Sequence, residues 1–120
     1  MGVTHVTAQV FNLARTNRPY EGEFLIDTGS IDCMAPGEAL EKIGIQKEGR
    51  CVYELASGDT VEYERGFARI ALMGQETVVQ IIFGPVGIEP ILGVVALENM
   101  GFVVDPGSNR LKRVAALPLK

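Results

Sequence analysis

The chain has 120 residues, enough for one domain that buries roughly two-thirds of its unfolded surface. Its net charge of −4 and pI near 5.0 argue against nucleic-acid binding, which needs a basic face or stripe. No uninterrupted apolar run approaches the roughly 20 residues of a membrane span. We therefore expect a single soluble domain, residues 1–120, with neither nucleic acid nor a membrane as its partner.

Two cysteines, Cys33 and Cys51, accompany an N-terminal segment without a basic start or a sustained apolar stretch. A signal peptide would show both features, so we expect free thiols and a cytoplasmic location. Two isolated cysteines are too few for a cysteine-based zinc site, and no phosphate loop or dinucleotide-binding glycine pattern is present. We expect neither a metal nor another cofactor.

The first half of the chain predicts strands over residues 3–13 and 20–26, separated by a polar loop at 15–19. A tight turn, Asp27-Thr28-Gly29, follows the second strand. Residues 38–43 then predict a short helix, since they begin with an acidic residue and are followed by Gly44.

The middle of the chain predicts a hairpin of strands 51–56 and 60–72, which turns at Ser57-Gly58-Asp59. Residues 76–83 are apolar and β-branched enough for a buried strand, which a proline and a glycine then break. Farther on, Asp105-Pro106-Gly107 predicts a type I turn. The tail 111–119 alternates apolar and polar residues, which suits either a dimer-interface strand or pairing within the same chain.

A short pattern occurs twice. Residues 39–45 read ALEKIGI and residues 96–102 read ALENMGF, with Ala, Leu, Glu and Gly at matching positions. Each copy follows a strand and a glycine turn, so both halves of the chain predict strand, turn, short helix and glycine stop. Ordinary helix composition with a glycine C-cap would produce the same likeness.

Asp27 is the residue most in need of explanation. A carboxylate beside a buried strand costs free energy unless it is hydrogen-bonded, paired or protonated. Thr28 can brace the turn through its hydroxyl, and Gly29 allows another backbone to approach closely. A simple turn that closes a hairpin is the alternative interpretation.

These motifs together resemble the retroviral-type, or retropepsin-like, single-domain aspartic proteases over nearly the whole chain. The resemblance implies a mainly β fold, a closed β-barrel with a flap hairpin and one or two short helices. It assigns the catalytic carboxylate to Asp27, loop support to Thr28, Gly29 and Ser30, and the substrate-covering flap to Ser57, Gly58 and Asp59. Ile91-Leu92-Gly93 and the helix after it would close the back of the site.

Peptide hydrolysis by carboxylates needs one ionised and one protonated group, so a single Asp27 cannot perform it alone. The chain has no second Asp-Thr-Gly, which predicts a homodimer with Asp27 from each copy, acting on peptide or protein substrates. Thr28 would then lock the two loops together. Ser30 would donate a hydrogen bond to the ionised carboxylate and favour a more acidic optimum.

The chain also departs from the retroviral pattern. Retroviral members pair an Asp just after the active-site motif with an Arg at the start of the C-terminal helix. The corresponding neighbourhoods here read Ser30-Ile31-Asp32 and Gly93-Val94-Val95, and both members of that ion pair are missing. Asp32 is left as a substrate contact, a solvated loop carboxylate or a cap. Two alternatives to an endopeptidase therefore stay open: a non-catalytic dimerisation or peptide-binding module on the same fold, and a generic β-barrel with a fortuitous motif.

Overall fold

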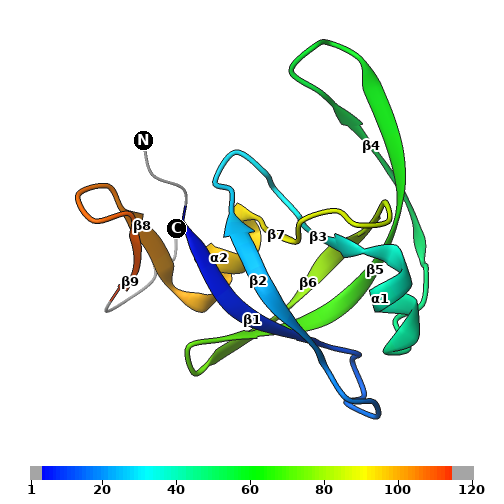
Figure 1. Cartoon of the computed structure of the whole chain (residues 1–120), viewed down its shortest axis with the longest axis horizontal. Coiled ribbons are helices and arrows are strands. Elements are labelled where there is room, and N and C mark those ends of the chain that lie inside the picture. The colour runs from blue at the N-terminus through cyan, green and yellow to red at the C-terminus, as the bar shows by residue number, and fades with distance from the viewer. Residues whose placement is uncertain (1–3, 115–120) are drawn as a thin grey trace.

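The computed structural model describes residues 4–114 and is mainly β, with two short helices (Figure 1). The elements in chain order are β1 (His5–Phe11), β2 (Tyr20–Ile26), β3 (Cys33–Pro36), α1 (Gly37–Lys42), β4 (Gly49–Glu54), β5 (Thr60–Leu72), β6 (Gln75–Gly84), β7 (Ile91–Leu92), α2 (Val94–Met100), β8 (Phe102–Asp105) and β9 (Arg110–Arg113). Within residues 4–114, no helix is long and apolar enough to cross a bilayer.

Seven strands form one sheet in the order β1-β2-β7-β3-β6-β5-β4. Strand β1 also pairs with β5, with Gln9 opposite Ala71 and Val10 opposite Ile70. This second pairing curls the sheet partly into a ring and leaves β4 as an edge strand that projects from the body with the upper part of β5 (Figure 1). Strands β8 and β9 form a separate two-stranded sheet.

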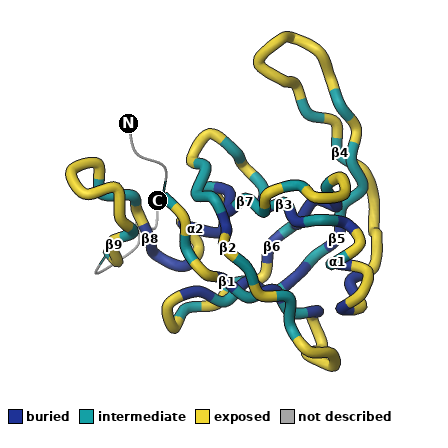
Figure 2. The backbone as a smooth tube through the Cα atoms, viewed as in Figure 1, coloured by how far each residue is buried: buried dark blue, intermediate teal, exposed yellow. Residues whose placement is uncertain are grey.

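The core lies inside the curled sheet and is covered by both helices. Val10, Phe24 and Ile70 are fully buried on inward-facing positions of three strands, and Leu40 of α1 and Leu97 of α2 pack against the same cluster. Buried positions alternate with half-buried ones along the second half of β5, from Gly66 to Leu72, as in a strand with one face on the core (Figure 2). The apolar burial explains why this arrangement is stable without a disulfide.

The repeated pattern does form two short helices, each followed by a glycine with a left-handed backbone. Gly44 has φ +88° and Gly101 has φ +81°, a region that glycine enters without the steric cost of a Cβ. The expected order of strand, turn and helix is interrupted in the first copy, because an additional strand, β3, lies between the Asp27 turn and α1. Four residues that end in proline gave too short a pattern to predict this strand.

The predicted hairpin, the strand at 20–26 and the turn after Asp105 are all present. Leu111 of the apolar tail lies in β9 and pairs with Val104 of the same chain. Residues 115–119 of that tail lie outside the described residues. The basic residues near the C-terminus, Arg110, Lys112 and Arg113, are exposed on β9.

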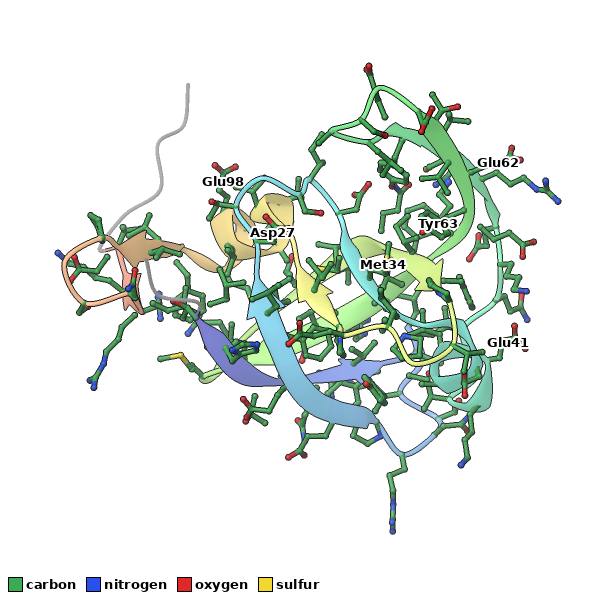
Figure 3. The ribbon with its side chains drawn as sticks, turned by 45° about the horizontal axis from the view of Figure 1, so that its top comes forward. Asp27, Met34, Glu41, Glu62, Tyr63 and Glu98 are labelled. Carbon is green, nitrogen blue, oxygen red and sulfur yellow. The ribbon has the colours of Figure 1, made fainter. Side chains whose placement is uncertain are left out.

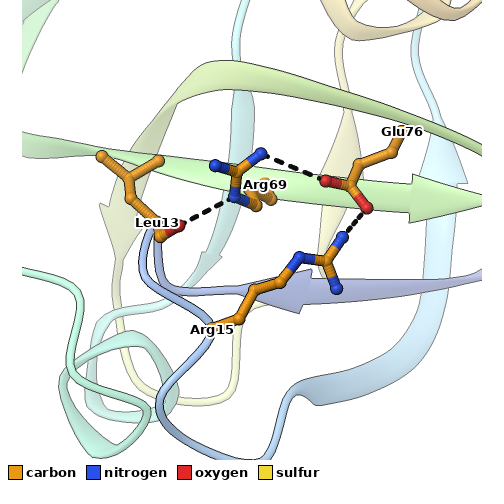
Figure 4. Close-up of polar contacts among 4 residues, drawn as sticks. All are labelled: Leu13, Arg15, Arg69 and Glu76. Carbon is orange, nitrogen blue, oxygen red and sulfur yellow. Dashed lines mark hydrogen bonds and ion pairs between the residues drawn. The ribbon is translucent and has the colours of Figure 1, made fainter.

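A polar cluster ties the β1–β2 connection to the β5–β6 hairpin, at the end of the molecule opposite the β4–β5 hairpin (Figures 1 and 4). The Nε of Arg69 donates to the Leu13 carbonyl at 2.8 Å, and its Nη1 lies 3.3 Å from Glu76 Oε2. Arg15 forms a second ion pair with Glu76. One carboxylate therefore bridges an arginine of β5 and an arginine of the β1–β2 connection.

Candidate functional site

The Asp27 turn lies where the chain crosses from one strand to another over the end of a third. Strand β7 lies between β2 and β3, parallel to the first and antiparallel to the second. Strands β2 and β3 are consecutive in sequence, so residues 27–32 must leave the sheet, pass the end of β7 and return. This crossing places Asp27 at the rim of the sheet (Figures 1 and 3).

Hydrogen bonds within the turn fix the position of the carboxylate. The amide of Asp27 donates to the Leu92 carbonyl at 3.0 Å, which continues the pairing of β2 with β7. The amide of Gly29 donates to Asp27 Oδ1 at 3.0 Å, and the amide of Ser30 donates to the Asp27 carbonyl at 3.0 Å. Asp27 is half-buried, whereas Thr28 and Gly29 are exposed at the top of the turn. The turn therefore presents its carboxylate in a defined orientation.

Gly93 and the start of α2 support this turn from behind. The amide of Val94 donates to the Ser30 carbonyl at 2.7 Å, and that of Val95 donates to the Ile31 carbonyl at 3.3 Å. A Cβ on Gly93 would lie 2.5 Å from the Asp32 carbonyl oxygen, closer than any such contact tolerates. Only glycine lets the two segments approach this closely. The predicted role of Ile91-Leu92-Gly93 as the back of the site is consistent with this packing.

The projecting hairpin of β4 and β5, which we call the flap for its shape alone, turns where the sequence predicted. The Leu55 amide donates to the Asp59 carbonyl at 2.7 Å, and the Gly58 amide donates to the Leu55 carbonyl at 2.9 Å. Gly58 has φ +92°, so the turn requires a residue without a Cβ. Ser57, Gly58 and Asp59 are exposed (Figure 2), and none of them lines the hollow between this hairpin and the Asp27 turn.

A hollow of about 460 Å³ lies between the flap and the Asp27 turn. Its walls come from three places: the turn, both strands of the flap, and the sheet beneath them. The lining residues are Gly29, Ser30, Ile31, Asp32, Met34, Val52, Tyr53, Glu54, Leu55, Val61, Tyr63, Ile82 and Ile91. Figure 3 shows Asp27, Met34 and Tyr63 on these three parts of the molecule. Asp27 itself is not among the lining residues, but the residues that follow it are.

Asp32 is the most connected side chain of the hollow. Its Oδ2 accepts a hydrogen bond from the Tyr53 hydroxyl at 2.6 Å and another from Gln80 Nε2 at 2.9 Å. Arg65 in turn donates from Nη1 to Gln80 Oε1 at 2.8 Å. Burial and the hydrogen bond to Asp32 raise the pKa of Tyr53 well above its usual range, so this hydroxyl stays a donor. Asp32 is therefore neither a free loop carboxylate nor a helix cap in this chain.

Tyr53 and Tyr63 both line the hollow and also contact each other, with ring centroids 6.5 Å apart. Sequence reasoning did not find the Tyr53 hydrogen bond. It also missed Gln80 and Arg65. Gln80 precedes the β6 residue that pairs with Cys33, so only the β3–β6 register brings it beside Asp32.

The structure corrects the predicted partner of Ser30. Its hydroxyl donates to the Asp32 carbonyl at 2.9 Å instead of to the Asp27 carboxylate. The turn reverses so tightly after Ser30 that the carbonyl two residues ahead is within reach. The expected acidic shift of the optimum through Ser30 therefore loses its basis within one chain.

The remaining reactive side chains do not form a second site. Both cysteines are free thiols, Cys33 buried and Cys51 half-buried. Burial raises the pKa of the Cys33 thiol to about 11. The Sγ of Cys51 lies 3.4 Å from Gln80 Nε2. His5 pairs with Glu89 at 2.7 Å on the surface. Across the described part of the chain, no three His, Cys, Asp or Glu side chains gather as a metal site would require.

Comparison of the chain with models of protein families gives no match, and comparison with curated proteins gives none.

Proposed function

We propose that this protein is an aspartic endopeptidase of the retropepsin-like type, active as a homodimer. One observation carries the proposal: the Asp27 turn and the flap hairpin border the same hollow, although about 25 residues separate them in sequence. A turn that only closed a hairpin would need neither the crossing over β7 nor the close support from Gly93.

The chemistry requires a second copy. One carboxylate must take a proton from water while the oxygen of that water attacks the peptide carbonyl carbon. Another must donate a proton to the carbonyl oxygen, and the amide nitrogen of the scissile bond leaves protonated. Each chain supplies one such carboxylate, so Asp27 of two copies would face each other across a two-fold axis. The exposed position of Thr28 leaves it available for contact with the same turn of the second copy.

The hollow then forms one half of a cleft for an extended peptide. Exposed Gly29 lets the backbone of the substrate pass close to Asp27, and the flap covers the peptide and excludes water. The apolar residues Met34, Ile82 and Ile91 form the floor and suit apolar side chains of the substrate.

Asp27→Asn tests the proposal, with Asp105→Asn as a matched control. Asp105 also accepts a hydrogen bond from the glycine amide two residues ahead, at 3.1 Å, in a turn between β8 and β9. We expect the wild type and Asp105→Asn to cleave a peptide library between roughly pH 4 and 7, and Asp27→Asn to cleave nothing. Cleavage by Asp27→Asn at the wild-type rate would refute the proposal.

Mixing tests the dimer. Equal amounts of wild type and Asp27→Asn, allowed to exchange subunits, should retain about one quarter of the activity of an all-wild-type sample at the same total concentration, since only pairs with two intact copies are active. A value near one half would mean that each chain acts alone.

The non-catalytic alternative rests on Val94 and Val95, which occupy the start of α2 where the retroviral pattern has an Arg. A peptide-binding module would bind members of the library with equal affinity in the wild type and Asp27→Asn, and neither would cleave them. Binding measured by fluorescence anisotropy separates this outcome from the catalytic one.

A further inference from the structure

A chain of hydrogen bonds connects the flap to the turn that carries Asp27. It runs from Arg65 on β5 to Gln80 on β6, then to Asp32 just before β3, and from there to Tyr53 on β4. Asp32 Oδ2 receives both of the last two bonds, at 2.9 Å from Gln80 and 2.6 Å from Tyr53. Strands β4 and β6 are therefore joined at one carboxylate oxygen of the Asp27 turn, and β5 is linked to it through Gln80.

Gln80 holds that carboxylate in place. Arg65 pairs with Ile82 across β5 and β6, so Gln80 is its diagonal neighbour on the same face of the sheet. The Arg65 guanidinium binds the amide oxygen of Gln80, which leaves the amide nitrogen directed at Asp32. A positive charge at one end and a negative charge at the other polarise the amide between them and strengthen both bonds.

The flap has few other polar anchors. Strand β4 is the edge of the sheet and pairs only with β5, and a two-stranded hairpin by itself is marginally stable in water. In residues 4–114, the side chains of β4 make two hydrogen bonds beyond their own hairpin. Tyr53 binds Asp32 at 2.6 Å, and Cys51 receives a long contact of 3.4 Å from Gln80.

We propose that Tyr53 and Asp32 form a latch that fixes the flap above the Asp27 turn, with both residues acting as positioning residues and Gln80 aiming the carboxylate. The latch sets the resting height of the flap and thereby preorganises the hollow for a peptide. Its effect on hydrolysis rests on the proposed peptidase function, whereas its effect on the flap does not.

Hydrogen exchange of the 120-residue chain tests the latch directly. We expect Tyr53→Phe to raise the amide exchange rates of residues 50–62 by about tenfold or more, because a hydrogen bond to an ionised acceptor is lost. Tyr63→Phe is the matched control: Tyr63 is on the same hairpin and lines the same hollow, but its hydroxyl has no hydrogen-bond partner within the described residues. Equal exchange in both variants and the wild type would overturn the proposal.

Asp32→Asn provides a second variant that removes the charge and keeps the shape. It should loosen the same flap residues, and adding Tyr53→Phe to it should have a much smaller further effect, since both substitutions break one bond. Fully additive effects on exchange would show that the two side chains act independently and would overturn the latch. Amides of β1 and β2 serve as an internal reference for global unfolding.

Kinetics show what the latch does for the enzyme. Tyr53→Phe should raise KM several-fold and leave kcat within about threefold, because the free enzyme must now order its flap when the peptide binds. A fall in kcat with an unchanged KM would contradict a positioning role. Absence of cleavage by the wild type would refute the peptidase, and the exchange experiment would still decide the latch.

Discussion

Replacing Gly93 by alanine tests whether close backbone packing holds the Asp27 turn in place. Gly93 has φ −88° and ψ 172°, an extended conformation that alanine adopts freely, so the substitution changes only the contacts. The new Cβ would lie 2.5 Å from the Asp32 carbonyl oxygen, 2.6 Å from the Asp32 carbonyl carbon and 2.6 Å from the Ile31 carbonyl oxygen. All three are backbone atoms, which cannot rotate away as a side chain would.

Ordinary contacts to a Cβ begin near 3.4 Å, so each approach is too short by about 0.8–0.9 Å. Overpacking typically costs about 1–3 kcal/mol, and the rigid surroundings of Gly93 place it at the upper end. A loss of about 3 kcal/mol corresponds to a fall in Tm of roughly 10–15 °C for a domain of this size. Urea unfolding followed by circular dichroism, together with thermal scans, measures both quantities.

Gly107→Ala is the control for that experiment. A Cβ there would meet only Asp105 Oδ1 at 3.6 Å, an ordinary contact, so its free energy of unfolding should stay within about 0.5 kcal/mol of the wild type. Equal stability of Gly93→Ala and Gly107→Ala would refute the argument that the turn depends on close approach at Gly93.

Three further predictions concern other parts of the chain. Burial raises the pKa of Cys33 to about 11, so the folded state keeps this proton to higher pH than the unfolded state does, and the free energy of unfolding should fall between about pH 9 and 11. In urea titrations, Cys33→Ala should remove about 2–3 kcal/mol of that fall, and parallel pH profiles of the variant and the wild type would contradict this. Glu76→Gln removes both arginine ion pairs at the surface, so it should lower the free energy of unfolding by less than about 1 kcal/mol at low salt and by close to nothing in 1 M salt. A loss of stability that persists in 1 M salt would contradict this. Asp32→Asn should lower the pKa of Tyr53, because the charge that opposes tyrosinate formation is gone, and an unchanged high-pH step in the tyrosine absorbance titration would count against the contact.

The parts of the fold that the sequence predicted are those set by neighbouring residues. Residues 20–26 form β2 with the predicted bounds because an apolar run ends at a turn sequence. The flap turn depends on Gly58 at φ +92°, and both helices end beside glycines with positive φ. Each of these signals lies within a few residues of the feature it determines, which is why a single sequence carries it.

The parts that could not be predicted depend on pairing between distant segments. Strand β7 has two residues and β3 has four, so neither has a recognisable alternation of its own. Their places in the sheet follow from the crossing at Asp27. Asp32 finds partners 21 and 48 positions away in Tyr53 and Gln80, and no local pattern marks them. The turn at Asp27 and the turn of the β4–β5 hairpin were therefore predictable, whereas the contacts that join them through Asp32 were not.

The turn that carries Asp27 is held by its own chain, and this bears on how a dimer would work. Leu92, Gly93 and Val94 fix the turn from behind through backbone contacts that need no second copy. Association of two chains would therefore bring together turns that are already formed, without the further cost of ordering them. In the proposed dimer, association would add only the approach of the two Asp27 carboxylates, which is the one part of the proposed site that a single chain cannot supply.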